Sequence, residues 1–406
     1  MADLEKGEAG TAETKEAIAT TPDVSVRELA GYFLKLGAFG FGGPIALAGY
    51  MQRDLQEERK WITRDEYQDG LAIAQTLPGP LAAQLAMWIG FIRGGFLGAT
   101  AVGVAFILPP FLIVTTVAAL YVAFEGLPLI RALFYGIGPA AIAIVVLAAW
   151  KLAKSTDRND AKLWGTSLVV MAITVATRSE LAWLFILAGI LGIVVYAPRS
   201  RGSSAEGSGR KLAGILAIPL ANLPALAIPA ATAGTLAILT LFFLKASLFT
   251  FGSGLAIVPF LYQGVVADYH WLNDRQFLDA VAMGLITPGP VVITATFIGY
   301  LVGGVPGAVL ASFAVFFPVW VFNVVIGRLF LAHRGNPQVR AFVKGATAAA
   351  VGAIAGAAVI LGEGALVDLV TIGIFGVALV VLYFKKLKEP YVVGLAGLVG
   401  VLVLHG

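Results

Sequence analysis

Long apolar stretches separated by short polar segments dominate the pattern along the chain. Residues Phe96 to Phe124, Ala132 to Trp150 and Ala365 to Phe384 carry almost no charge, and about 20 apolar residues in a helix cross the hydrocarbon of a bilayer. Runs such as Ile142 to Ala149 lack the period-two alternation of a transmembrane β-strand. The pattern therefore predicts an all-α integral membrane protein, built as a polytopic helical bundle.

Composition narrows the function classes. Hydrophobic residues make up 59% of the chain and charged residues 13%, with a mean hydropathy of +0.88. The chain has no cysteine, and its three histidines show no metal-ligand spacing, so we expect neither a metal nor another cofactor. Its basic residues lie in short loops between apolar stretches, where positive-inside topology explains them better than nucleic-acid binding.

Two polar segments predict the domain organisation. Residues 1–26 are rich in Glu, Ala, Thr and Lys without an apolar core, so we expect a disordered cytoplasmic tail rather than a signal sequence. Residues 199–211 carry four basic residues among Gly and Ser, which predicts a flexible cytoplasmic linker. These boundaries predict an N-terminal transporter repeat over 27–198 and a C-terminal repeat over 212–406.

The two predicted repeats are similar to each other at an offset of 210 residues. Thirteen of the 48 positions from Phe33 to Pro80 are identical in the second half, and Trp61 falls on Trp271. Chance similarity between apolar stretches would not preserve Trp, Lys, Asp and a Pro-Gly-Pro motif together. The halves are therefore homologous.

The basic loops predict that the halves have opposite orientations. Placing the loops rich in Lys and Arg in the cytoplasm requires seven membrane segments before the homologous stretch of the second half, which begins near Leu239. One of the seven lies over Ala213 to Pro229. On this count the chain has about 13 segments, its halves are inverted and its N-terminus is cytoplasmic. The loop from Arg53 to Arg64 would lie outside, unless a re-entrant first segment leaves it inside. Inverted repeats are typical of secondary transporters, whose substrate site lies near the midplane.

Gly- and Pro-rich breaks interrupt apolar segments at matching positions of both repeats. Each repeat has an early break and a later Pro-Gly-Pro break, so we expect broken or re-entrant helices. The freed backbone groups must meet protein, water or ligand, and helix N-termini attract anions. The alternative is that these residues only kink helices or allow close packing. The break residues that we assign to substrate binding are Gly42, Gly43, Pro44, Pro78, Gly79, Pro80, Gly252, Ser253, Gly254, Pro288, Gly289 and Pro290.

Three basic residues within or beside apolar segments are further candidate ligands. Lys35 and Lys245 occupy equivalent positions about one helical turn before the early breaks, where a buried ammonium would bind an anion and an exposed one would snorkel. Arg93 ends an apolar segment and is either a ligand or an interfacial anchor.

Polar residues near the breaks extend the predicted site. Thr76, Gln84 and Thr287 are candidate hydrogen-bond donors to an oxyanion, or they hydrogen-bond to neighbouring helices. Asp69 and Asp279 match across the repeats and are candidates for proton coupling, because burial moves the titration of a carboxyl toward neutral pH. The alternative places both aspartates at the membrane surface as helix N-terminal charges.

Four motifs carry a resemblance to a known family. FGFGGP over 39–44, LPGP over 77–80, FGSG over 251–254 and TPGP over 287–290 closely resemble the long-chain chromate ion transporter family, over essentially the whole chain after the tail. The resemblance implies a carrier in the bacterial inner (plasma) membrane that exports chromate at the expense of the proton motive force, an antiporter that gives chromate resistance. Ser253 and Gly254 replace Gly43 and Pro44 of the first half, so the halves are expected to contribute unequally to the site.

Other functions stay open at this point. Chromate and sulfate are both tetrahedral dianions, so a sulfate or other oxyanion transporter and a passive anion channel are the alternatives. The chain has no HExxH, GxSxG or nucleotide-binding P-loop motif, so neither an enzyme nor an ATP-driven pump is expected. The expected partners are the oxyanion and membrane lipid, with a second copy of the chain in a homodimer as a further candidate.

Overall fold

The computed structural model describes residues 24–124, 128–156, 160–178, 182–197, 233–248, 250, 254, 257–327, 336–385, 387 and 389–405. Over these ranges the protein consists of helices and connecting turns, without a β-strand. The expected linker, the expected segment Ala213 to Pro229 and all but the last three residues of the expected tail lie outside the described residues.

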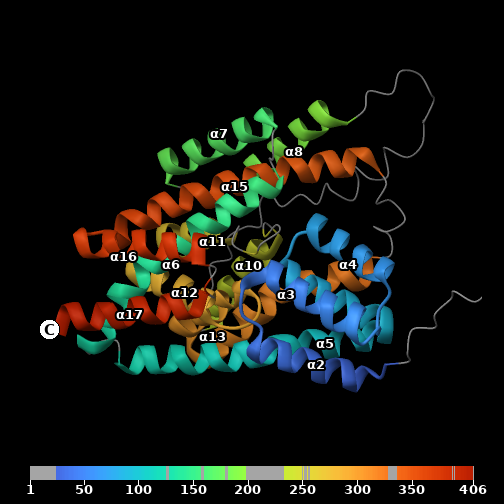
Figure 1. The fold of residues 1–406 in the computed structure, drawn as a ribbon, viewed down its shortest axis with the longest axis horizontal. Coiled ribbons are helices and arrows are strands. Elements are labelled where there is room, and N and C mark those ends of the chain that lie inside the picture. Colours follow the sequence, from blue (N-terminus) through green and yellow to red (C-terminus); the bar gives the residue numbers. More distant parts are fainter. Residues whose placement is uncertain are drawn as a thin grey trace, which may run out of the picture.

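The helices follow the same order in both halves (Figure 1). The first half contains α2 (Val26–Phe39), α3 (Gly43–Met51), η1 (Gln52–Glu58), α4 (Arg64–Thr76), α5 (Leu81–Phe124), α6 (Pro128–Thr156), α7 (Ala161–Thr177) and α8 (Ala182–Tyr196). The second half contains α10 (Ala233–Leu248), α11 (Ile257–Tyr262), η2 (Gln263–Asp268), α12 (Asp274–Ile286), η3 (Val291–Ile293), α13 (Thr294–Val321), η4 (Phe322–Ile326), α15 (Pro337–Ala365), α16 (Leu369–Val380), η5 (Val381–Lys385) and α17 (Glu389–His405).

Helices α5 and α13 each fold back on themselves at a pair of glycines. The second glycine of Gly94–Gly95 has a φ of 57°, and that of Gly303–Gly304 a φ of 62°, a conformation that favours glycine. Gly90 packs against Gly98 so closely that a Cβ on Gly90 would lie 2.4 Å from the Gly98 carbonyl oxygen. Each of these helices is therefore a tight hairpin, with a short first arm and a long second arm.

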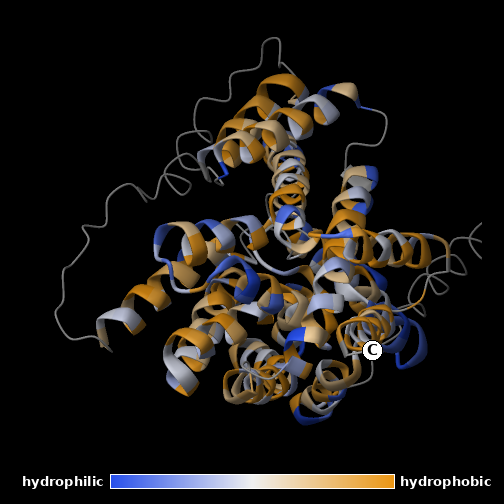
Figure 2. Ribbon diagram, turned by 90° about the vertical axis from the view of Figure 1, so that its left-hand side faces the viewer, coloured by the Kyte–Doolittle hydropathy of each residue, from blue (hydrophilic) through white to orange (hydrophobic). Residues whose placement is uncertain are grey.

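The helices have the length and surface of membrane segments. Four of them are long and apolar enough to cross a bilayer: Leu81–Phe124, Pro128–Lys154, Val291–Ile326 and Pro337–Ala365. Shorter apolar helices of 10–17 residues accompany them. Figure 2 shows hydrophobic residues on most helical turns, with hydrophilic residues gathered in short stretches. Many of these side chains point outward, such as Leu97, which is 73% exposed. The chain is therefore a multi-pass membrane protein.

The C-terminal helices of each half pack on the other half. Helices α7 and α8 pack against α15, whereas α16 and α17 pack against α6 (Figure 1). Small residues bring the backbones together: a Cβ on Gly136 would lie 1.9 Å from the carbonyl oxygen of Ala396, and one on Gly345 2.0 Å from that of Ala188. Through these contacts the two halves pack together as one structural unit.

The equivalent helices α6 and α15 lie side by side and run in opposite directions. A Cβ on Gly138 would lie 3.9 Å from Ala365, and a Cβ on Gly362 would lie 3.9 Å from Ile142. The beginning of α6 thus lies beside the end of α15. Equivalent helices of the two halves thus form an antiparallel pair.

Candidate functional site

The early break of the first half separates α2 from α3. Gly42 has a φ of 108° and Gly43 a φ of 73°, and Pro44 occupies the first turn of α3. Left-handed backbone at both glycines reverses the chain where L-residues with a side chain would be strained. Of the second early break, Gly254 is described and is buried with a φ of 78°, whereas Gly252 and Ser253 lie outside the described residues.

Each Pro-Gly-Pro segment forms the tip of a helical hairpin. In the first half, α4 and the first arm of α5 run antiparallel, because Trp88 Nε1 donates to the carbonyl of Glu66 at 3.1 Å. Gly79 at the tip has a φ of 137° and is buried with Pro80, whereas Pro78 is half-buried. In the second half, α12 and η3 flank the tip, where Gly289 has a φ of 95°. Pro288, Gly289 and Pro290 are all buried.

Each tip contacts the early break of the opposite half. The Gly79 N–H donates to the carbonyl of Thr250 at 2.5 Å, and the Gly289 N–H donates to the carbonyl of Gly40 at 3.0 Å. Gly40 and Thr250 are equivalent positions, so the two contacts are reciprocal. In addition, a Cβ on Gly254 would lie 3.6 Å from Pro80. The structure thus brings together the described parts of all four breaks.

Polar side chains surround the tips. The Gln84 side chain is fully buried, and its Nε2 donates to the Pro78 carbonyl at 2.6 Å and to the Leu77 carbonyl at 3.2 Å. Its Oε1 has no hydrogen-bond partner among the described residues, which is uncommon for a buried acceptor. Thr287 donates to the Met283 carbonyl at 2.6 Å, and Thr76 is half-buried at the end of α4.

The three basic candidates lie apart from this enclosed centre. Lys35 and Lys245 are exposed on α2 and α10, and Lys245 Nζ lies 5.9 Å from the ring centre of Phe260. Arg93 forms an ion pair with Glu66 at 2.5 Å and donates from Nε to the Trp61 carbonyl at 2.7 Å. These contacts fit the role of an anchor for the first hairpin. The assignment of all three residues as substrate ligands stays a prediction.

The two candidate aspartates differ in their surroundings. Asp279 on α12 is only 2% exposed, and the hydroxyl of Tyr121 on α5 donates to its Oδ2 at 2.8 Å. Asp69, the equivalent residue on α4, is half-buried. Asp279 lies about two helical turns before the second tip. A buried carboxyl so close to the tips has the position that proton coupling requires, but that role also stays a prediction.

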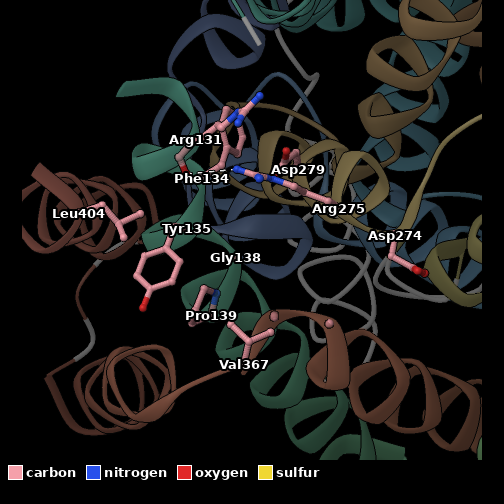
Figure 3. Close-up of a pocket in the computed structure, with 12 residues that line it drawn as sticks. Arg131, Phe134, Tyr135, Gly138, Pro139, Asp274, Arg275, Asp279, Val367 and Leu404 are labelled. Carbon is pink, nitrogen blue, oxygen red and sulfur yellow. Dashed lines mark hydrogen bonds between the residues drawn. The ribbon is translucent and has the colours of Figure 1, made fainter. Parts of the chain in front are cut away.

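A cavity of about 450 Å³ reaches Asp279 from one end of the protein. It lies between α6, α12 and the C-terminal ends of α15 and α17, and an adjoining cavity of about 440 Å³ continues it to Tyr121. Figure 3 shows Arg131, Arg275 and Asp279 close together along its wall. We did not predict the two arginines from the sequence. The available signal was the match of Arg131 with Arg340, which align at an offset of 209 residues after a one-residue gap in the repeat alignment.

A comparison with family models decides the family. The model of the chromate transporter family matches the chain twice, over residues 27–193 and 237–401. The chain belongs to the chromate transporter family. This confirms the resemblance inferred from the four motifs. Membership implies a transporter rather than an enzyme.

Two relatives match nearly the whole chain, and a shorter transporter matches part of it. A chromate transport protein of Cupriavidus metallidurans is 49% identical over 388 residues, covering 95% of this chain and 94% of the relative. A probable chromate transport protein of Synechococcus elongatus is 48% identical, covering 94% and 96%. An uncharacterized transporter of Bacillus subtilis is 30% identical over 176 residues, which cover 42% of this chain but 97% of that transporter. No solved structure matches the chain.

Proposed function

We propose that the protein is a secondary active transporter that exports chromate across the bacterial inner (plasma) membrane, driven by exchange with protons. The observation that carries this proposal is the reciprocal crossing of the broken segments, in which Gly79 contacts Thr250 and Gly289 contacts Gly40. Crossed breaks from two homologous halves form the type of site that inverted-repeat carriers use. Chromate is the named substrate of the two near-full-length relatives.

The crossing offers the chemistry that a tetrahedral dianion needs. The first arm of α5 begins at Leu81 beside the tip, and residues 81–84 are all buried. The first N–H groups of a helix have no acceptor within the helix, and they carry the positive end of the helix dipole. In the second half η3 begins at Val291 in the same relation to its tip. Two such ends pointing at one place would hold an oxyanion by backbone donors, with Gln84 and Thr287 beside them.

The charges at the two ends support an inverted topology. One end holds Lys151, Lys154, Lys162 and Lys344, and Lys344 lies 3.6 Å from Asp160 of the loop before α7. The other end holds Glu363, which pairs with Arg178 at 2.6 Å. By the positive-inside rule the lysine end faces the cytoplasm. The antiparallel pair α6 and α15 then relates the two halves by inversion.

Contacts within the first half support a cytoplasmic position for the basic loop between Arg53 and Arg64. Arg93, at the turn of α5, donates to the Trp61 carbonyl of this loop, and a Cβ on Gly94 would lie 2.5 Å from Val26. The long arm of α5 leads from this turn to the beginning of α6, at the end that holds Glu363. We therefore favour the re-entrant alternative, in which both hairpins of the first half enter from the cytoplasm and the N-terminus is cytoplasmic.

Proton coupling is assigned to Asp279, with Asp69 as its counterpart in the first half. Asp279 combines burial near the tips with access from the cavity. Burial in a low-dielectric site favours the neutral, protonated form of a carboxyl group. Protonation of Asp279 would change the charge about two helical turns from the tip, and this change would alter the affinity of the site for an anion. Proton entry through the cavity would thus accompany anion release.

The experiment is transport by the purified protein in liposomes. Chromate and sulfate uptake are measured with and without an imposed pH gradient, and empty liposomes serve as the control. We expect chromate flux that increases with the gradient. Equal flux with and without the gradient would reject proton coupling and favour a passive anion channel, whereas preference for sulfate would identify a different oxyanion transporter. The absence of flux of either anion would refute the carrier.

A further inference from the structure

We propose that Arg131 and Arg275 form a second oxyanion site, in the cavity above Asp279 and separate from the crossed breaks. This inference rests on the proposed transport function and adds a second binding site on the transport path of the same anion. It would bind chromate or a similar tetrahedral dianion at the end of the protein that holds Glu363.

The two arginines come from different halves and meet at one point. Arg131 lies in the first turns of α6 and Arg275 in the first turn of α12. Arg275 Nη2 donates to the Arg131 carbonyl at 3.2 Å. Both residues line the cavity and its continuation to Tyr121, together with Asp279 (Figure 3). An anion between them would therefore contact both halves at once.

The cavity wall carries two arginines and two aspartates. Neither arginine forms an ion pair with a described residue. The two carboxylates of the cavity wall already accept tyrosine hydroxyls: Asp274 from Tyr262 at 2.6 Å, and Asp279 from Tyr121 at 2.8 Å. A dianion bound between two guanidinium groups is attracted by both positive charges. The planar guanidinium also donates two parallel hydrogen bonds, which suits an oxyanion better than an ammonium does.

The equivalent position in the other half lacks this pair. Arg131 corresponds to Arg340 at the offset of 209 residues that follows the one-residue gap, whereas Arg275 corresponds to Asp65 at the offset of 210. The residue at the equivalent position of the first half is thus acidic rather than basic. The second oxyanion site should therefore act from one side of the membrane only, which distinguishes it from the central site.

The first test is the sidedness of the Michaelis constant. Arg131→Gln and Arg275→Gln should each raise KM for chromate presented at the cavity end by about tenfold, the loss expected for one charge-assisted interaction. KM at the other end and the maximal rate should change less than twofold, and Arg131→Lys should keep part of the affinity. Arg340→Gln is the matched control and should behave as wild type. Unchanged KM values in both variants would overturn the site, and an equal loss of maximal rate from both sides would indicate a structural role.

The second test measures binding without transport. Phenylglyoxal modifies accessible arginines, and mass spectrometry follows each modified peptide of the purified full-length protein. Chromate should slow the modification of Arg131 and Arg275 several-fold more than chloride of equal ionic strength, and should leave Arg178 and Arg340 unaffected. Equal modification rates with and without chromate would overturn the second site even if chromate flux is normal. Absent flux with clear protection would instead refute the proposed transport function.

Discussion

The Tyr121 hydroxyl of the first half donates a 2.8 Å hydrogen bond to the buried carboxylate of Asp279 in the second half. The phenol ring of Tyr121 also packs edge-on against Phe134 and Phe297, with ring centres 5.3 Å away in both cases. One side chain thus links α5, α6, α12 and α13 at the floor of the cavity. A rearrangement that moves one half relative to the other must either break this hydrogen bond or move both residues together.

Tyr121→Phe should destabilise the protein by about 1–3 kcal/mol, because it leaves a buried carboxylate without one donor. Thermal unfolding in detergent measures this loss. Tyr391→Phe is the control, since Tyr391 is 65% exposed on α17.

Asp279→Asn tests the coupling role separately: chromate exchange at equal pH should persist, whereas stimulation by a pH gradient should disappear. Full stimulation in Asp279→Asn would exclude this residue from proton coupling.

Gly79→Ala should abolish most of the transport and lower stability by roughly 1–3 kcal/mol, because its φ of 137° is strained for any residue with a Cβ. The added Cβ would also lie 2.7 Å from Gln84 Nε2 and 3.0 Å from Val319. Gly289→Ala should act in the same way, since a Cβ there would lie 3.0 Å from Pro110.

The control for the tip variants is Gly31→Ala on α2, where an added Cβ would meet no atom within 4 Å. Chromate flux and thermal unfolding are measured for the three variants side by side. Wild-type flux in both tip variants would show that the crossed tips are not the transport site.

The homology of the halves and the positions of the breaks could be predicted from the sequence, because both depend on local residue types. The Pro-Gly-Pro motifs fix where helices must end, whatever they pack against. The reversal at Gly94–Gly95 was missed, because two glycines in an apolar stretch also fit a continuous packed helix. The cavity arginines were missed as well, since Arg131 and Arg275 lie far apart along the chain and meet because α12 of the second half packs against α6 of the first.

Asp368, in the loop before α16, should make the free energy of unfolding depend on pH in the acidic range. Asp368 caps α16: the Thr371 N–H donates to it at 2.8 Å, and the Tyr135 hydroxyl of the other half at 2.6 Å. These two donors hold the pKa of Asp368 below its ordinary value of about 4. The carboxylate therefore stabilises the fold above that value, and the contribution is lost as the pH falls through the lowered pKa. Asp368→Ala should have a lower Tm than wild type at pH 7, and the difference should shrink as the pH falls below about 4. A constant difference over this range would show that the carboxylate charge is not involved.

The orientation of the ends can be tested by single cysteines, because the natural chain has none. The residues Arg59, Lys162 and Glu363 are all exposed, so each replacement should be accessible to a membrane-impermeant maleimide. In intact cells Glu363→Cys should react, whereas Lys162→Cys and Arg59→Cys should react only after permeabilisation. The result for Arg59→Cys decides between the two topologies: reaction in intact cells would place the loop outside and exclude re-entrant hairpins in the first half. Reaction of Lys162→Cys and Glu363→Cys from the same side would contradict the assignment of the lysine end to the cytoplasm, and with it the inverted arrangement that the antiparallel helices α6 and α15 support.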